Sequence, residues 1–290
     1  DMKGSDCAMI TAAARYAEKT GKDFAGKICV SCTVHEECFE GVSSREITRL
    51  AKPDFVIIGE ATTTTVKRGQ RGRAEVVVET EGVSCHSSNP EKGVNAVYEM
   101  MAVIEEIRKI VPNEHPLLGK GILELTDIIS KPYPGASVVP SLCRATFDRR
   151  TLVGEDEGVI LGQVNEAIAR AQEKHPSLKA RCYLAEGEEK CWTGETIRAK
   201  RYFPAWVVDE DSELVQGAMK GLKDAGIEAK LSHFAFCTNG SSFCGEAGIP
   251  CIGYGPSLES LAHVRDEYIE IDQLTKACKG FECILAQLTK

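Results

Sequence analysis

The sequence lacks the features that would place it in a specialised class. It has no apolar run of the roughly 18 or more residues that a membrane helix requires, so no membrane partner is expected. The net charge of −8 argues against a surface for nucleic acid. The first six residues have no signal-peptide pattern, and no internal repeats or low-complexity tracts occur. The remaining class is a globular protein of 290 residues, long enough for two domains.

The 13 cysteines also lack a pattern, because their number is odd and their spacing is not that of a disulfide framework. Several fall in apolar segments, including Cys29, Cys32 and Cys251, which suits reduced thiols buried as small hydrophobic side chains. Cys29 and Cys32 form the single C-x-x-C motif, but in a strand their thiols would face opposite sides. That geometry is poor for zinc or for a redox pair. The cysteines therefore predict a cytoplasmic protein.

What the sequence contains is a change of pattern that predicts two domains. Helices and strands alternate at both ends of the chain, as in a mostly parallel sheet. The elements expected there are helices at 5–20, 46–50, 212–225 and 271–287, and strands at 27–34, 55–58 and 250–254. Between residues 73 and 187 the order becomes βαββαβ, the ferredoxin-like arrangement. The elements expected there are strands at 73–81, 121–129, 137–149 and 179–185, and helices at 95–110 and 156–173. We therefore expect an α/β domain in two segments, 1–72 and 188–290, with an inserted domain at 73–187.

The adjacent carboxylates Glu36 and Glu37 are the most informative pair in the chain. They follow the predicted buried strand at 27–34, and open α/β sheets bind ligands at this end of their strands. Neighbouring residues on a strand face opposite sides, so one carboxylate can bind a metal while the other faces a water or substrate. Those are the two tasks of metal-assisted hydrolysis. Taken alone, the pair also fits a solvated strand end.

Three further residues are candidate metal ligands near the ends of other elements. Glu60 follows the predicted strand at 55–58, His263 lies in the loop after the strand at 250–254, and Asp1 precedes the first helix. Carboxylates and imidazole suit Zn²⁺, and carboxylates with water suit Mn²⁺. Each residue alone is also typical of an ordinary surface. Their convergence at one sheet edge would be a metal site.

Five ordered motifs resemble those of the M20 family of di-zinc amidohydrolases and exopeptidases, the carboxypeptidase G2, succinyl-diaminopimelate desuccinylase and acetylornithine deacetylase type. The motifs are Asp1-Met2-Lys3-Gly4, His35-Glu36-Glu37, Gly59-Glu60-Ala61-Thr62, Ser84-Cys85-His86 with Pro90, Gly93 and Asn95-Ala96, and Leu261-Ala262-His263 with Asp266-Glu267. Within the family, the segments 68–73, 82–86, 118–121, 202–206 and 238–240 most resemble the selenium-metabolism hydrolases.

The resemblance implies a zinc-exopeptidase-like catalytic domain and an inserted lid domain through which two copies form a homodimer. It implies two divalent metals, zinc as the first choice and cobalt or manganese as alternatives. Their ligands would be Asp1, which bridges the metals, Glu37, Glu60 and His263. Glu36 would be the general base. His86 would reach the site of a partner subunit and stabilise the oxyanion.

The resemblance further implies hydrolysis of an amide C–N bond in a small N-acyl amino acid or dipeptide-like substrate. Asn239, Gly240 and Arg150 are the implied substrate-binding residues. Asn-Gly is also a strong turn signal, and Arg150 also fits a structural ion pair.

One departure from the family pattern affects the metal site. The family's first ligand is a histidine in an H-x-D motif upstream of the aspartate, whereas this chain begins at Asp1. We therefore expect it to match roughly the C-terminal two-thirds to three-quarters of a family member. A non-catalytic relative or an inactive fragment with an incomplete site is the alternative. Retention of both Glu36 and Glu37 argues against a degenerate relative.

Overall fold

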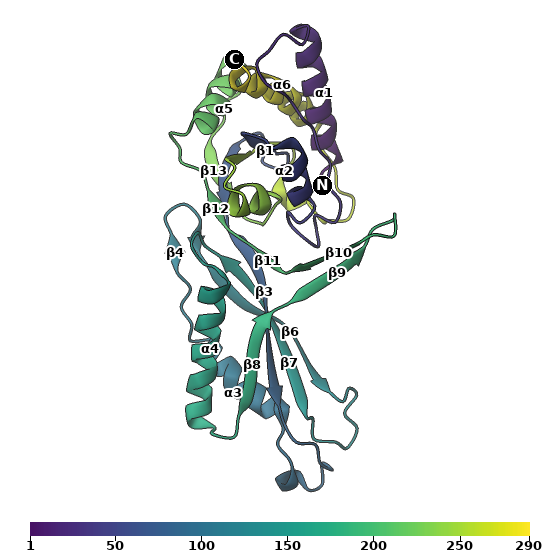
Figure 1. Ribbon diagram of the computed structural model, residues 1–290, viewed down its shortest axis with the longest axis vertical. Helices are drawn as coiled ribbons and strands as arrows, with labels where there is room; N and C mark the ends of the chain where they lie inside the picture. The colour runs from purple at the N-terminus through teal and green to yellow at the C-terminus, as the bar shows by residue number, and fades with distance from the viewer.

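The computed structural model describes residues 1–290 and divides them between two bodies with separate hydrophobic cores (Figure 1). The upper body in Figure 1 combines both ends of the chain, and the lower body is built from its middle. No helix in the structure has both the length and the apolar character that crossing a bilayer requires.

The sheet of the upper body consists of short strands from both ends of the chain. They are β1 (Val56–Ile58), β2 (Val66–Gln70), β12 (Trp206–Val207), β13 (Leu231–Phe234) and β14 (Cys251–Gly253). β1 pairs in parallel with β14, and β13 pairs in parallel with β2. β2 pairs antiparallel with β14 and with β12. The predicted α/β class is confirmed, and its sheet is mixed rather than mostly parallel.

Helices cover this sheet and supply nine of the 19 buried residues in its core. They are α1 (Lys3–Lys19), α2 (Ser44–Ala51), α5 (Glu213–Asp224) and α6 (Ile271–Leu288). α6 packs against both α1 and α5 (Figure 1). α5 shows why these segments are helical, because Leu214, Ala218 and Leu222 recur every four residues and are completely buried.

The lower body has the predicted ferredoxin-like order. Its elements are β3 (Gly72–Glu81), α3 (Ala96–Ile107), β6 (Ile122–Lys131), β7 (Leu142–Thr151), α4 (Glu157–Lys174) and β8 (Lys179–Leu184), with a small hairpin of β4 (Glu114–His115) and β5 (Gly119–Lys120) after α3. β3 lies between β7 and β8, and β6 forms the free edge beyond β7, with every pairing antiparallel. α3 and α4 pack on this sheet and on each other. We call this body the lid domain.

The two bodies meet where the chain returns from the lid domain. β11 (Tyr202–Phe203) pairs antiparallel with the first residues of β3, next to the upper body. Just before it, β9 (Glu186–Lys190) and β10 (Thr196–Lys200) form a hairpin that projects sideways from this junction (Figure 1). A π-helical segment at Ser241–Glu246 and two 3-10 segments, Pro90–Lys92 and Glu259–Leu261, complete the structure.

The predicted buried strand at 27–34 is wrong. These residues have no regular secondary structure, and the side chains of Val30 and Val34 are 39% and 50% exposed. A strand needs a paired neighbour, and β1 pairs only with β14. A cavity of about 810 Å³ is lined by both the 27–33 segment and β1. Cys29 and Cys32 are accordingly exposed on a loop instead of buried in a strand.

Candidate metal centre and active site

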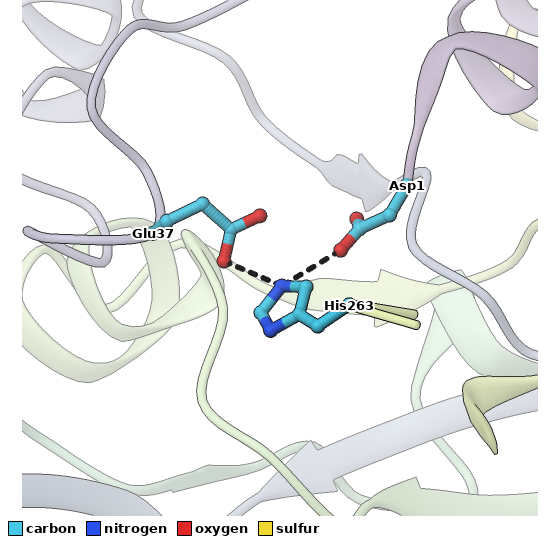
Figure 2. A group of neighbouring side chains, drawn as sticks. All are labelled: Asp1, Glu37 and His263. Atoms are coloured by element: carbon cyan, nitrogen blue, oxygen red, sulfur yellow. Dashed lines mark ion pairs between the residues drawn. The ribbon is translucent and has the colours of Figure 1, made fainter. Parts of the chain in front are cut away.

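Three of the predicted ligands converge on one point (Figure 2). Nε2 of His263 lies 2.9 Å from Oδ2 of Asp1 and 3.0 Å from Oε2 of Glu37. The three ligand atoms all lie within 4.8 Å of one another. They come from the segment before α1, the turn before α2 and the loop before α6, so the fold assembles the group from distant parts of the chain.

This donor set fits a divalent cation. The Nε2 atom of a neutral imidazole carries at most one proton, which cannot be donated well to both carboxylates at once. One cation can accept all three ligand atoms, and two carboxylate oxygens with one imidazole nitrogen suit zinc. The side chains of Glu37 and His263 are 59% and 68% exposed, so the group opens to solvent on one side.

The backbone of each ligand is held in a defined local conformation. The Asp1–Met2 peptide is cis, and α1 begins one residue later. His263 has a φ of +61°, in the left-handed region that few side chains adopt, two residues after the end of a 3-10 segment. Glu37 lies in a turn closed by the Phe39 amide, which donates to the carbonyl of His35 at 2.9 Å.

Glu36 lies beside this group and is the candidate general base. Its Oε1 atom is buried without a hydrogen-bond partner. Burial, followed by the negative charges of Glu60, Glu37 and Glu40, raises the pKa of Glu36 to about 9. The backbone of Asn239 acts in the opposite direction and lowers this pKa. A cation bound nearby would also lower the pKa of Glu36. The carboxyl group could then be ionised and accept a proton, as a base requires.

Glu60 is buried next to the same acidic group. It lies two residues after the end of β1 and is 8% exposed. Burial first, and the charge of Glu37 second, raise the pKa of Glu60 to about 7. Its oxygens do not belong to the group of three ligand atoms, but its charge acts on Glu36. The structure thus brings four predicted acids and His263 into one region.

The three predicted substrate residues have different surroundings. Asn239 lines the cavity together with Glu36, and its Nδ2 atom donates to Oγ1 of Thr33 at 3.1 Å. Gly240 packs against the ring of Trp206. Nε of Arg150 donates to Oδ2 of Asp148 at 2.8 Å, which is the ion pair weighed as the alternative for this arginine. A role in binding substrate stays a prediction for all three.

His86 lies far from this group within one chain. β3 starts at the junction with the upper body and runs for ten residues, about 30 Å, before the segment that carries His86 begins. The imidazole Nδ1 of His86 is 2.7 Å from Oγ of Ser88, and its backbone bridges to Val138 in the lid domain.

Both the sequence and the fold are similar to those of known proteins. Residues 68–176 match the family model of the peptidase dimerisation domain, M20_dimer. The chain is 32% identical over 276 residues to the uncharacterised protein YgeY of Escherichia coli K12, covering 92% of this chain and 66% of YgeY. It is 26% identical over 247 residues to acetylornithine deacetylase of Klebsiella pneumoniae, covering 78% and 54%. The chain belongs to the M20 family.

The fold agrees with this M20 assignment. The crystal structure of aminopeptidase PepT from Bacillus cereus ATCC 10987 matches with a TM-score of 0.74 at 15% identity. That match covers 98% of this chain and 70% of PepT, and at this identity it concerns the fold alone. The chain spans 66% and 54% of the lengths of the two curated relatives named above. The predicted family is confirmed.

Sequence reasoning missed two buried residues that follow the M20 acid pair in the same turn. Phe39 and Glu40 follow the pair within three residues, and both side chains are buried. Their partners, Arg73 and Arg201, are distant in the sequence. No local pattern could therefore have identified them.

Proposed function

We propose that this chain carries the metal and base residues of an M20 hydrolase that cleaves an amide C–N bond. The observation that carries the proposal is the convergence of Asp1, Glu37 and His263 beside the enclosed carboxylate of Glu36. The proposed substrate is a small N-acyl amino acid or a dipeptide-like molecule. The relative from Klebsiella pneumoniae, an acetylornithine deacetylase, supports this class.

Two divalent cations are part of the proposal, with zinc as the first candidate and cobalt or manganese as alternatives. Asp1, Glu37, Glu60 and His263 would hold them. When bound, such cations lower the pKa of water and polarise a carbonyl oxygen. The nitrogen and oxygen donors of this group fit that chemistry.

Glu36 moves the proton in the proposed reaction. Its carboxylate takes a proton from the water that attacks the scissile carbonyl. It then gives this proton to the leaving nitrogen as the C–N bond breaks.

The proposal also covers the domain organisation and the assembly of two chains. We assign residues 73–187 to the lid domain and residues 1–72 and 188–290 to the catalytic domain, which the two separate hydrophobic cores support. A homodimer through the lid domain is supported by the match to the dimerisation domain. A cytoplasmic location and a place among the selenium-metabolism hydrolases complete the proposal. The absence of framework spacing among the 13 cysteines supports the former.

A non-catalytic family member is the second candidate. The observation that favours it is that three ligand atoms converge while Glu60 lies outside that group. Metal analysis of the full-length gene product separates the two candidates. Two bound cations per chain are expected for the hydrolase, and fewer than two in an active protein would remove the bridging role of Asp1.

Substitution of the base is the direct test. We expect Glu36→Gln in the zinc-loaded, full-length gene product to lower kcat by roughly 10²- to 10⁴-fold, because a general base contributes about that much. The substrates screened would be N-acyl amino acids and dipeptides. The matched control is Glu228→Gln, at an exposed glutamate in the loop after α5. If kcat stays within about tenfold, a change of only ~1.4 kcal/mol in the barrier, Glu36 is not the base.

A further inference from the structure

The turn that carries the acid pair is attached to the junction between the two bodies by a buried aromatic ring. Phe39 is 1% exposed and packs against Phe203 of β11 and Cys237. The guanidinium of Arg201 lies 5.3 Å from the centroid of the Phe39 ring. Nη1 of Arg201 also donates to the carbonyl of Cys38 at 3.0 Å. An apolar and a cationic contact therefore hold the same turn to the segment that returns from the lid domain.

The next residue makes a second attachment through charge. Glu40 is 7% exposed, and its Oε1 atom accepts a hydrogen bond from Nη1 of Arg73 on β3 at 2.6 Å. Nε of Arg73 lies 3.3 Å from Oδ1 of Asp148 on β7. The second oxygen of Glu40 is buried without a partner, so Arg73 alone compensates this carboxylate. Removal of one partner of such a pair leaves an uncompensated buried charge.

These contacts lie very close to the proposed base in the chain. Phe39 and Glu40 belong to the turn that also contains Glu36 and Glu37, and the Phe39 amide closes that turn. β3, β7 and β11 are all strands of the lid-domain sheet. A displacement of that sheet against the catalytic domain would therefore move Phe39 and Glu40, and the acid pair with them.

We propose that Phe39 and Glu40 are positioning residues that tie the position of Glu36 to the orientation of the lid domain. We call their contacts with Arg201 and Arg73 the latch. Its effect on turnover rests on the proposed function. Its effect on the mobility of the turn does not, because the contacts exist whatever reaction the site performs.

The kinetic test compares Glu40→Gln, Arg73→Gln and the double variant in the zinc-loaded, full-length gene product. We expect each single variant to lower kcat about tenfold while KM stays within about twofold, because a loosened base affects the transition state more than substrate binding. We expect the double variant to be no slower than the slower single variant, because both changes remove the same contact between Glu40 and Arg73. The matched controls are Glu79→Gln and Arg181→Gln, an ion pair of 2.6 Å further along β3. Their kcat should stay within about twofold of wild type.

Hydrogen exchange tests the latch independently of turnover. We expect the backbone amides of residues 36–42 to exchange roughly tenfold faster in Glu40→Gln than in wild type. Amides of β3 beyond residue 76 should be unchanged, and Glu79→Gln should leave the turn unaffected. A wild-type protein without hydrolase activity would overturn the proposed function, and exchange alone would then decide on the latch.

Three results would overturn the latch. One is unchanged exchange in the turn of Glu40→Gln. Another is a lower thermal midpoint with unchanged kcat in an active protein, which is the behaviour of a purely structural ion pair. The third is additive loss of kcat in the double variant.

Discussion

The contacts of Gly240 explain why a glycine is found at this position, although the local sequence fits more than one role. Next to Asn239 it fits a turn or a substrate loop, yet its φ of −57° is one that any residue adopts. A β-carbon at this position would lie 2.5 Å from Nε1 of Trp206, which is 2% exposed. The close approach of backbone and indole therefore explains the glycine.

We predict that Gly240→Ala lowers the free energy of unfolding by about 1–3 kcal/mol, the usual cost of overpacking a core. Denaturant titration measures this change. Gly162→Ala is the matched control, because a β-carbon there would meet nothing within 4 Å in the interior of α4. We expect the control to gain about 0.5–1 kcal/mol. Equal effects in the two variants would show that packing on Trp206 does not explain Gly240.

The candidate site was predictable from the sequence in its residues but not in its geometry. The acids and His263 are recognisable by type and order, so the sequence sufficed to predict Asp1 and Glu37 as partners of His263. The argument that Glu36 and Glu37 face opposite sides of a strand is wrong, because they lie in a turn. The two carboxylates differ in burial instead, since one oxygen of Glu36 is enclosed while the Glu37 side chain is 59% exposed.

At the scale of elements, segments with a strong internal period were predictable, and segments that depend on a partner were not. The helix expected at 156–173 is α4 at Glu157–Lys174, because its apolar positions repeat with the helical period. The apolar run at 27–34 pairs with no strand and does not form one. The β9–β10 hairpin was missed because β9 has no apolar side chain and the alternation in β10 is limited to Ile197 and Ala199.

Glu106 forms ion pairs that join helices α3 and α4, and the helical period of the sequence cannot predict them. It lies on α3 and pairs with Lys109 at 2.7 Å, with Arg170 of α4 at 3.4 Å, and with Lys174 of α4. Hydrogen bonds from Lys109 and then Lys174 lower the pKa of its carboxyl to about 2. The ionised carboxylate thus holds the two lid-domain helices together.

We predict that Glu106→Gln lowers the thermal midpoint at pH 7 and that this deficit disappears in acid. The folded pKa lies below the ordinary value of 4.5, so the contribution is complete above that value and is lost as the pH falls towards about 2. Midpoints measured between pH 7 and pH 2 test this. Glu166→Gln, at an exposed residue of α4, is the control and should change little at any pH. A deficit that is constant across the range would exclude the ionised carboxylate as its cause.

At the scale of the molecule, the inserted ferredoxin-like body was predictable, but its attachment to the catalytic domain was not. The order βαββαβ defines the lid-domain fold because its connections leave few alternatives. The latch joins side chains that are more than 30 positions apart in the sequence, such as Glu40 and Arg73. Contacts of this kind depend on how two finished folds meet.

The lid domain also has a surface suited to a second copy. β6 is the edge strand of its sheet, so one row of its backbone groups is unpaired. Ile122, Ile128 and Ile129 on this strand are 39%, 46% and 42% exposed. A homodimer formed here would bury apolar surface and extend the pairing of the edge. It would also bring the far end of one lid domain towards the partner.

Subunit mixing tests whether His86 acts across such a dimer. His86→Ala and Glu36→Gln are each expected to inactivate the pure homodimer, because the first lacks the oxyanion donor and the second lacks the base. In a hybrid dimer, one site combines the intact Glu36 of the first chain with the intact His86 of the second. An equal mixture that has exchanged subunits should therefore recover about a quarter of the wild-type rate, since half of the dimers are hybrids with one working site. Size-exclusion chromatography with light scattering would confirm the dimer beforehand. Activity no greater than the sum of the two parents would contradict a role for His86 in the partner's site.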